Sequence, residues 1–287
     1  MKRIAFIFAI AVAALTCGKA WTQETAAPVL ESALLADSEV TPSALRVGPD
    51  FWEVRFMAYG WLPSTMGHAG VGSKVIGFHI SMDEVVDNLN LIDALIPLNL
   101  EVRAGNWGIL SDLLYVKVTD TVTKGLPPGA HARVMAEQTI LDLAGFYRVG
   151  TWVISPDSGN SLSVDLLAGE RFNRLEGNVG VQSSGQSVSV GGERHWWDPF
   201  VGTRATWTVD PRLSFSLRGD IGGFGLQDGS TNTWQVIGNG SYNFTKHMFL
   251  TLGYRTLSTN YTTGSGARRF VYDVRTSGPY LGLGVRF

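Results

Sequence analysis

The sequence of 287 residues lacks the features of a helical membrane protein and of a disulfide-rich or metal-binding protein. After the first twenty residues, no apolar run approaches the roughly 18 residues that a membrane-spanning helix needs. The single cysteine, Cys17, excludes an intramolecular disulfide framework. The histidines have no metal-ligand spacing, so we expect no metal and no other cofactor. They are His68, His79, His131, His195 and His247.

The first twenty residues have the composition of a secretory signal peptide. A positively charged start, Met1-Lys2-Arg3, precedes the apolar run from Ile4 to Thr16, and Ala20 is a small residue suited to cleavage. We therefore expect residues 1–20 to be removed. Two alternatives are an uncleaved anchor helix and lipidation of Cys17, although the preceding residues depart from the lipoprotein pattern.

Residues 21–50 contain Gln, Glu, Ser, Thr and two prolines without a sustained period, so we expect a flexible periplasmic leader. Loss of Lys2, Arg3 and Lys19 with the signal peptide leaves 20 basic and 25 acidic side chains. A chain with this acidic balance has no electrostatic reason to bind nucleic acid.

Residues 51–287 alternate between apolar and polar side chains. Within 213–220, for example, Leu213, Phe215 and Leu217 oppose Arg218 and Asp220. Soluble sandwiches share this period of two, so alternation alone does not identify a membrane protein.

Strand length and aromatic placement favour a transmembrane barrel. The segments 132–149, 161–181 and 187–209 are longer than the usual 3–10 residues of soluble strands, whereas tilted membrane strands need about 9–11 residues and can project beyond the lipid. Aromatic residues near the strand ends predict two interfacial girdles. These are Trp52, Trp61, Trp107, Tyr147, Trp152, Trp196, Trp197, Trp207, Tyr242, Phe244 and Tyr261.

The C-terminal segment has the pattern of an outer-membrane assembly signal. Its apolar face ends in a terminal phenylalanine, and we expect this strand to engage the barrel-assembly machinery. The residues concerned are Tyr280, Leu281, Leu283, Val285 and Phe287.

Turn positions predict an all-β, antiparallel transmembrane β-barrel of about ten strands over 51–287, in the outer membrane. Segment 67–80 is a possible extra hairpin that raises the number to twelve if it joins the wall, and Ser81 to Glu84 is a capping box that opens a short helix in the first external loop. Because 270–274 and 281–287 differ in phase, we also expect a bulge near 277–279.

Several of these segments together resemble a family of uncharacterised outer-membrane β-barrel proteins of Gram-negative bacteria. The resemblance implies the same fold and location and brings no established activity. The matching segments are Tyr59-Gly-Trp-Leu-Pro63, Asp83-Glu-Val-Val-Asp-Asn-Leu89, Gly105-Asn-Trp-Gly108 with Asp112, Asp198-Pro-Phe-Val-Gly202, Leu217-Arg-Gly-Asp-Ile-Gly-Gly-Phe-Gly225 and Tyr272-Asp-Val-Arg-Thr-Ser-Gly-Pro-Tyr-Leu-Gly-Leu-Gly284.

Charged side chains on the polar face are expected to point into the lumen, because an Arg or Lys facing lipid at the midplane costs about 2–4 kcal/mol. They predict a mostly filled, salt-bridged lumen and a structural or interaction role; the alternative is a narrow, porin-like channel for a small solute. The predicted lumen charges are Glu101, Arg103, Asp112, Asp142, Arg148, Asp165, Arg171, Arg204, Arg218, Asp220, Arg255, Asp273 and Arg275.

Two further residues bear on catalysis. His195 and Asp198 are candidates for the outer rim of a membrane hydrolase, but the sequence has no identifiable second acidic pair or activated serine. The expectation is therefore that the protein is not an enzyme, with a hydrolase as a minor alternative. Glu170 falls on the apolar phase of its segment, which predicts an outward position or a bulge.

Overall fold

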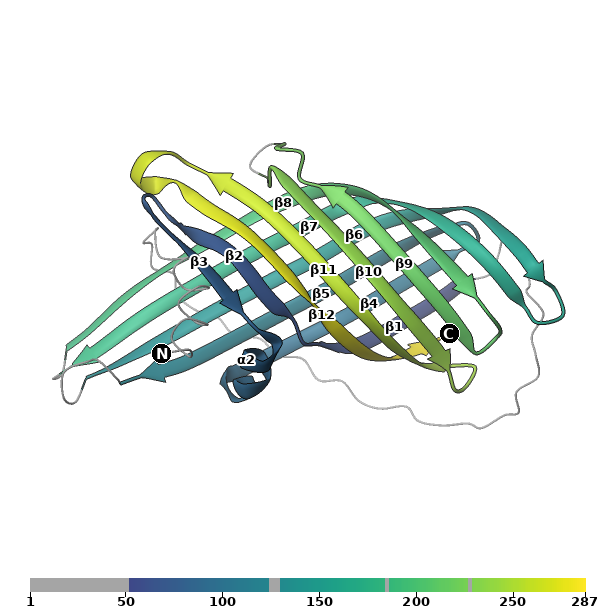
Figure 1. The fold of residues 1–287 in the computed structure, drawn as a ribbon, viewed down its shortest axis with the longest axis horizontal. Coiled ribbons are helices and arrows are strands. Elements are labelled where there is room, and N and C mark those ends of the chain that lie inside the picture. The colour runs from purple at the N-terminus through teal and green to yellow at the C-terminus, as the bar shows by residue number, and fades with distance from the viewer. Residues whose placement is uncertain (1–51, 124–129, 184–185, 227–228) are drawn as a thin grey trace.

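A computed structural model describes residues 52–123, 130–183, 186–226 and 229–287. The signal peptide expected at 1–20, with Cys17, and the leader expected at 21–50 lie outside these residues. The described strands form one antiparallel sheet that closes into a barrel (Figure 1), which confirms the predicted fold class. In this part of the chain no helix is long and apolar enough to span a membrane.

The strands agree closely with those expected from the alternation and the turn residues. They are β1 (Trp52–Trp61), β2 (Ser64–Val71), β3 (Lys74–Ile80), β4 (Ile92–Ala104), β5 (Trp107–Val122), β6 (His131–Ser155), β7 (Asn160–Ser183), β8 (Gln186–Thr208), β9 (Leu213–Gly222), β10 (Asn232–Asn243), β11 (Met248–Thr263) and β12 (Phe270–Arg286). The strand β6 is longer than expected, at 25 residues, because it continues through register shifts at 148–150 and 153–155.

The barrel is closed by the first and last strands. β12 pairs with β1 from Arg55 opposite Arg286 to Trp61 opposite Tyr280. The Phe287 amide also donates to the Val54 carbonyl at 2.9 Å. Closure of this seam leaves no unpaired strand edge in the lipid at this level, as a membrane-spanning sheet requires.

The β2–β3 hairpin joins the wall, so the prediction of twelve strands is the correct one. β2 follows β1 along β12, pairing Ser64 with Ser277 and Val71 with Phe270. Pro63 separates β1 from β2, because proline lacks the N–H that a continuous strand would donate. The segment that joins β1 to β2 lies close to β12 here, since a Cβ at Gly278 would lie 2.2 Å from the Leu62 carbonyl oxygen.

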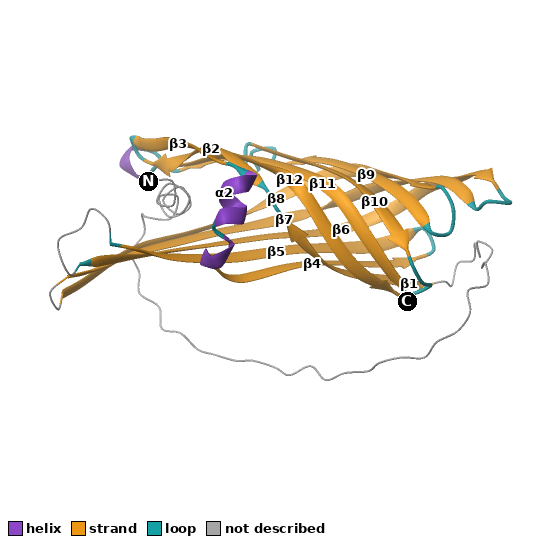
Figure 2. Ribbon diagram, turned by 60° about the horizontal axis from the view of Figure 1, so that its bottom comes forward, coloured by secondary structure: helices purple, strands orange, loops and turns teal. Residues whose placement is uncertain are grey.

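The helix α2 (Met82–Asp87) and the 3-10 turn η1 (Leu89–Leu91) lie between β3 and β4 in the chain. The predicted capping box is confirmed, because the Glu84 amide donates to Ser81 Oγ at 3.3 Å and the Ser81 amide donates to Glu84 Oε2 at 3.2 Å. In Figure 2, α2 lies between the β2–β3 hairpin and strands β4 and β5. Leu91 packs there against Val118 of β5.

Turn lengths orient the barrel. The tight connections at 105–106 and 244–247 lie at the end where β1 begins and β12 ends, whereas the longer connection 264–269 lies at the other end. Outer-membrane barrels have short periplasmic turns, so the chain termini of the barrel are periplasmic and 264–269 is external.

The outer surface carries an apolar belt between aromatic residues. On β8, Trp197 and Trp207 both point outward and are about half exposed; they lie about ten residues apart, which on a tilted strand spans about 25 Å, the height of the lipid-facing band. Trp61, Trp196 and Tyr261 instead point inward and are buried. Their predicted girdle position is wrong, because aromatic rings also fill the crowded lumen.

The predicted bulge in β12 is also wrong. β11 and β12 pair without a register shift from Met248 opposite Val285 to Thr263 opposite Phe270. Phe270 and Val274 are therefore buried inside the barrel, and Leu281 and Leu283 face the lipid. No bulge is needed, because apolar residues face inward at the external end of β12 and outward at its periplasmic end. At the external end the inner face of the strand contacts aromatic rings and the outer face contacts water.

We expect Leu252→Arg to destabilise the barrel. Leu252 points outward between the outward-facing Leu250 and Tyr254 and is 62% exposed, so an arginine there would place a charge in lipid, at a cost of up to about 2–4 kcal/mol. Urea titration of the refolded protein in lipid vesicles, followed by tryptophan fluorescence, measures the loss. Leu252→Ala and Thr121→Arg, the latter on the external part of β5, are the controls. A loss as small as that of Thr121→Arg would contradict the lipid-facing position.

Candidate functional site

Charged and polar side chains fill the lumen of the barrel. We describe them as the candidate functional site. Around the middle of the barrel the strands pair without register shifts, so each strand delivers one side chain to the interior at every second residue. The central layer consists of residues that are at most 7% exposed. They are Tyr59, Asp112, Asp142, Arg171, Arg218, Asp220, Gln235 and Arg255.

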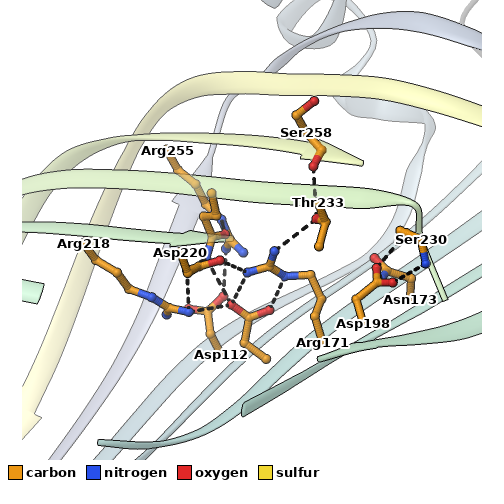
Figure 3. A network of polar contacts seen from close by, with 12 residues as sticks. Asp112, Arg171, Asn173, Asp198, Arg218, Asp220, Ser230, Thr233, Arg255 and Ser258 are labelled. Atoms are coloured by element: carbon orange, nitrogen blue, oxygen red, sulfur yellow. Dashed lines mark hydrogen bonds and ion pairs between the residues drawn. The ribbon is translucent and has the colours of Figure 1, made fainter. Parts of the chain in front are cut away.

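Arg171 is at the centre of this layer (Figure 3). Its Nε and Nη2 donate to the two carboxylate oxygens of Asp142 at 2.7 and 3.0 Å, and Nη2 also donates to Asp220 Oδ1 at 2.9 Å. Its Nη1 donates to Thr233 Oγ1 at 3.3 Å. The guanidinium thus uses the bidentate geometry that gives arginine–carboxylate pairs their strength.

Two more arginines balance the remaining charge. Arg218 Nη2 contacts Asp142 Oδ2 at 3.1 Å and Asp220 Oδ2 at 2.9 Å. Arg255 Nη1 donates to Asp112 Oδ1 at 2.7 Å. Three arginines thus face three aspartates, and the layer is electrically neutral, which a buried ionic cluster needs.

Neutral side chains join the ionic groups into one network. Gln235 Nε2 donates to Asp142 Oδ2 at 3.1 Å, and its Oε1 accepts from Arg255 Nε at 2.7 Å. The Tyr59 hydroxyl donates to Asp112 Oδ1 at 3.0 Å. The sequence analysis did not predict Tyr59, Thr233 and Gln235 as members of the network. The alternation along their strands nevertheless indicates that these three side chains point inward.

A second layer lies toward the periplasmic end. Arg204 bridges two acids: its Nη2 donates to Glu101 Oε1 at 3.0 Å, and its Nε donates to Asp165 Oδ2 at 2.9 Å. Arg148 Nε donates to the other oxygen of Asp165 at 2.8 Å. The Phe146 ring lies 4.8 Å from the Arg204 guanidinium. At the same end Arg103 pairs with Glu53.

A third layer lies toward the external end and is built on Asp198. Its carboxylate accepts four hydrogen bonds: from the Ser230 amide at 2.6 Å, Ser230 Oγ at 2.8 Å, Trp196 Nε1 at 3.0 Å and Asn173 Nδ2 at 3.1 Å. The side chain is fully buried. These donors stabilise the carboxylate without an ion pair, and they tie Ser230, just before β10, to the barrel wall.

Most of the predicted lumen charges point inward, but Asp273 and Arg275 do not. Both are exposed on the outer face of β12, and the Arg275 guanidinium lies 5.1 Å from the ring of the outward-facing Trp234. The rule that charges face inward fails here because this part of β12 lies at or above the lipid boundary. Glu170 is exposed on the outer face of β7 without a register shift, as its phase predicts.

The two candidate hydrolase residues do not form a pair. His195 points outward, is 64% exposed and lies 3.6 Å from Glu193. Asp198 points into the barrel and is fully buried. The two side chains are therefore on opposite faces of β8. Among the described residues, no cluster of three or more His, Cys, Asp or Glu side chains has the geometry to hold a metal.

Comparison with known proteins identifies the fold. No protein-family model matches the chain, and no curated protein matches it. The outer membrane protease OmpT from Escherichia coli is 12% identical and has a TM-score of 0.55, over 85% of this chain and 99% of OmpT. Ail of Yersinia pestis is also 12% identical, over 83% of this chain and 99% of Ail, with a TM-score of 0.34.

Of these two, only OmpT is similar enough in structure to bear on the fold, and at 12% identity it bears on nothing else. The closed antiparallel barrel, the apolar outer belt and the polar interior agree with this likeness. The chain is therefore a β-barrel protein with the fold of the Gram-negative outer-membrane barrels, and it spans that membrane.

Proposed function

We propose that the protein is a closed barrel that conducts no solute and has a structural or interaction role. The observation that carries the proposal is the burial of the central layer. Any channel wide enough for water would expose the side chains that line it, yet Asp142, Arg171 and Gln235 are 0% exposed. The phenyl ring of Phe200, 1% exposed, packs 5.1 Å from the Arg171 guanidinium and occupies further space.

The electrostatics of the layer support the same role. Buried ions are stable when each charge has a partner and few hydrogen-bonding groups are left over. A solute passing through would have to separate Arg171 from both Asp142 and Asp220. Such a separation would leave buried charges without partners at a cost of several kcal/mol, so the layer favours a permanent filling over a selective pore.

Contacts with other molecules are assigned to the parts of the barrel outside the lipid. The external ends of β5 to β8 extend beyond the Trp197 girdle and carry ion pairs on their outer face, including Lys117 with Glu137 at 2.7 Å and Arg174 with Glu193 at 2.9 Å. We propose no catalytic role, and the opposite orientations of His195 and Asp198 support this.

Planar-bilayer recording of the refolded protein tests the closed lumen. We expect no reproducible unitary current steps under conditions in which a general porin, as the positive control, conducts. Steps that appear reproducibly at low protein concentration would contradict the closed lumen and favour the narrow channel. Turnover of a peptide or lipid that His195→Ala abolishes would instead favour a hydrolase.

A further inference from the structure

A second polar site lies at the external end, apart from the lumen layers. A cavity of about 340 Å³ there is lined by two arginines, two hydroxyl side chains and a glycine. These are Arg194, Thr263, Gly264, Ser265 and Arg268. Arg194 comes from the inner face of β8, and the other four come from the end of β11 and the connection to β12. The volume falls within the range of small-ligand pockets.

The two arginines differ from those of the lumen in having no acidic partner among the described residues. Arg171, Arg204, Arg218 and Arg255 each contact at least one carboxylate. Within the residues that the structure describes, neither Arg194 nor Arg268 forms an ion pair. Two unneutralised guanidinium groups on one cavity repel each other, and a bound anion would remove that repulsion.

The site is held in place by packed groups. The Arg194 guanidinium lies 5.9 Å from the Phe270 ring centre, within the range of a cation–π contact. Phe270 is fully buried and packs on Tyr261, which stacks on Trp196 at 4.2 Å. Beneath Arg194 there is therefore a rigid aromatic floor, which reduces the ordering that a ligand would have to impose.

The loop that carries Arg268 is braced from its other side. Residues 266–268 form a 3-10 turn, and the Gly72 amide of the β2–β3 turn donates to the Arg269 carbonyl at 2.7 Å. Gly264 has a φ of +74°, a left-handed conformation that favours glycine. A Cβ at this position would lie 2.6 Å from the Arg268 carbonyl oxygen, so the absence of a side chain lets the two parts of the loop pack closely.

We propose that this cavity binds a phosphate monoester group. Arginine forks match the oxygens of such groups in bidentate geometry, and the two hydroxyl groups supply further donors. A phosphate monoester carries close to two negative charges at neutral pH, so it matches two guanidinium groups better than a singly charged carboxylate or sulfate ester does. The proposal does not depend on a closed lumen, because the cavity lies above the ionic layers.

Isothermal titration of the refolded full chain with glucose 6-phosphate, and with glucose as the uncharged probe, tests this site. We expect binding of glucose 6-phosphate only, weakened by added salt. Arg194→Gln and Arg268→Gln should each weaken it about tenfold or more, since each removes a charge-assisted hydrogen bond. Arg212→Gln, in a periplasmic turn, makes the same change of net charge and should leave the affinity unchanged.

Vesicles distinguish the source of the ester. If lipopolysaccharide of the surrounding leaflet supplies it, vesicles with phosphorylated lipopolysaccharide will compete with glucose 6-phosphate and dephosphorylated ones will not. If a soluble glycan supplies it, neither will compete, and both results support the site. Equal binding of glucose and glucose 6-phosphate, no binding of either, or full affinity in the Arg194→Gln/Arg268→Gln variant would overturn the proposal.

Discussion

Arg171→Ala is expected to lower the free energy of unfolding by about 3–5 kcal/mol, because it breaks a buried ionic cluster by removing one side only. Asp142 and Asp220 would lose three short hydrogen bonds from the same guanidinium. Arg218 would remain as their cationic partner, at 3.1 and 2.9 Å. One arginine cannot replace the bidentate pairing, so a buried negative charge would stay uncompensated.

Urea titration in detergent micelles, followed by tryptophan fluorescence and by the heat-dependent shift in gel migration, measures this loss. Arg212→Ala removes an exposed arginine from a periplasmic turn and should cost no more than about 0.5 kcal/mol. Adding Asp142→Asn to Arg171→Ala should recover part of the loss, because the two residues are coupled. A loss below about 1 kcal/mol would mean that water enters the layer, which contradicts the closed lumen.

Much of the fold could be predicted from the sequence because its signals are local. A period of two tells which residues share a face, and the turn residues set the strand ends. The capping box at Ser81 and Glu84 is complete within four residues, so the short helix was predictable as well. The inward set from Glu101 to Arg255 followed from the same period, together with the cost of a charge in lipid.

The pairing within the lumen could not be predicted, because it depends on how the strands are staggered around the barrel. Arg255 contacts Asp112, which is 143 residues earlier in the chain, and Tyr59 contacts Asp112 from β1. Alternation gives the face of each residue but not its height relative to a distant strand. The polar anchor at Asp198 was missed for the same reason, because its main partner, Ser230, follows β9.

The errors in β12 and in the girdles have another physical cause. Polarity identifies the inner face only where the outer face contacts lipid. Asp273 and Arg275 lie where the outer face meets water, so their charge says nothing about their side of the strand. Aromatic rings are equally ambiguous, because rings such as those of Trp196 and Tyr261 can pack in a barrel interior as well as at a membrane interface.

Deletion of residues 280–287 is expected to prevent formation of the folded barrel. These residues supply the β12 side of the seam, from Tyr280 opposite Trp61 to Arg286 opposite Arg55. Without them the periplasmic parts of β1 and β11 would present unpaired N–H and C=O groups to lipid, each at a cost of several kcal/mol. Because these groups lie along one seam, the losses add up to more than the stability of a typical domain.

The heat-dependent gel shift after refolding into vesicles measures this effect, with Phe287→Ala as the matched control. Phe287→Ala keeps the backbone pairing of Phe287 with Val54, so we expect it to refold in vitro almost as the unaltered chain does. In cells we expect the same variant to assemble less, because we propose that the terminal phenylalanine is recognised by the barrel-assembly machinery. Normal assembly of Phe287→Ala in cells would contradict the proposed recognition of the terminal phenylalanine, but it would not contradict the role of the β1–β12 pairing. A folded gel form of the truncated chain would instead show that β1 does not need β12 to close the barrel.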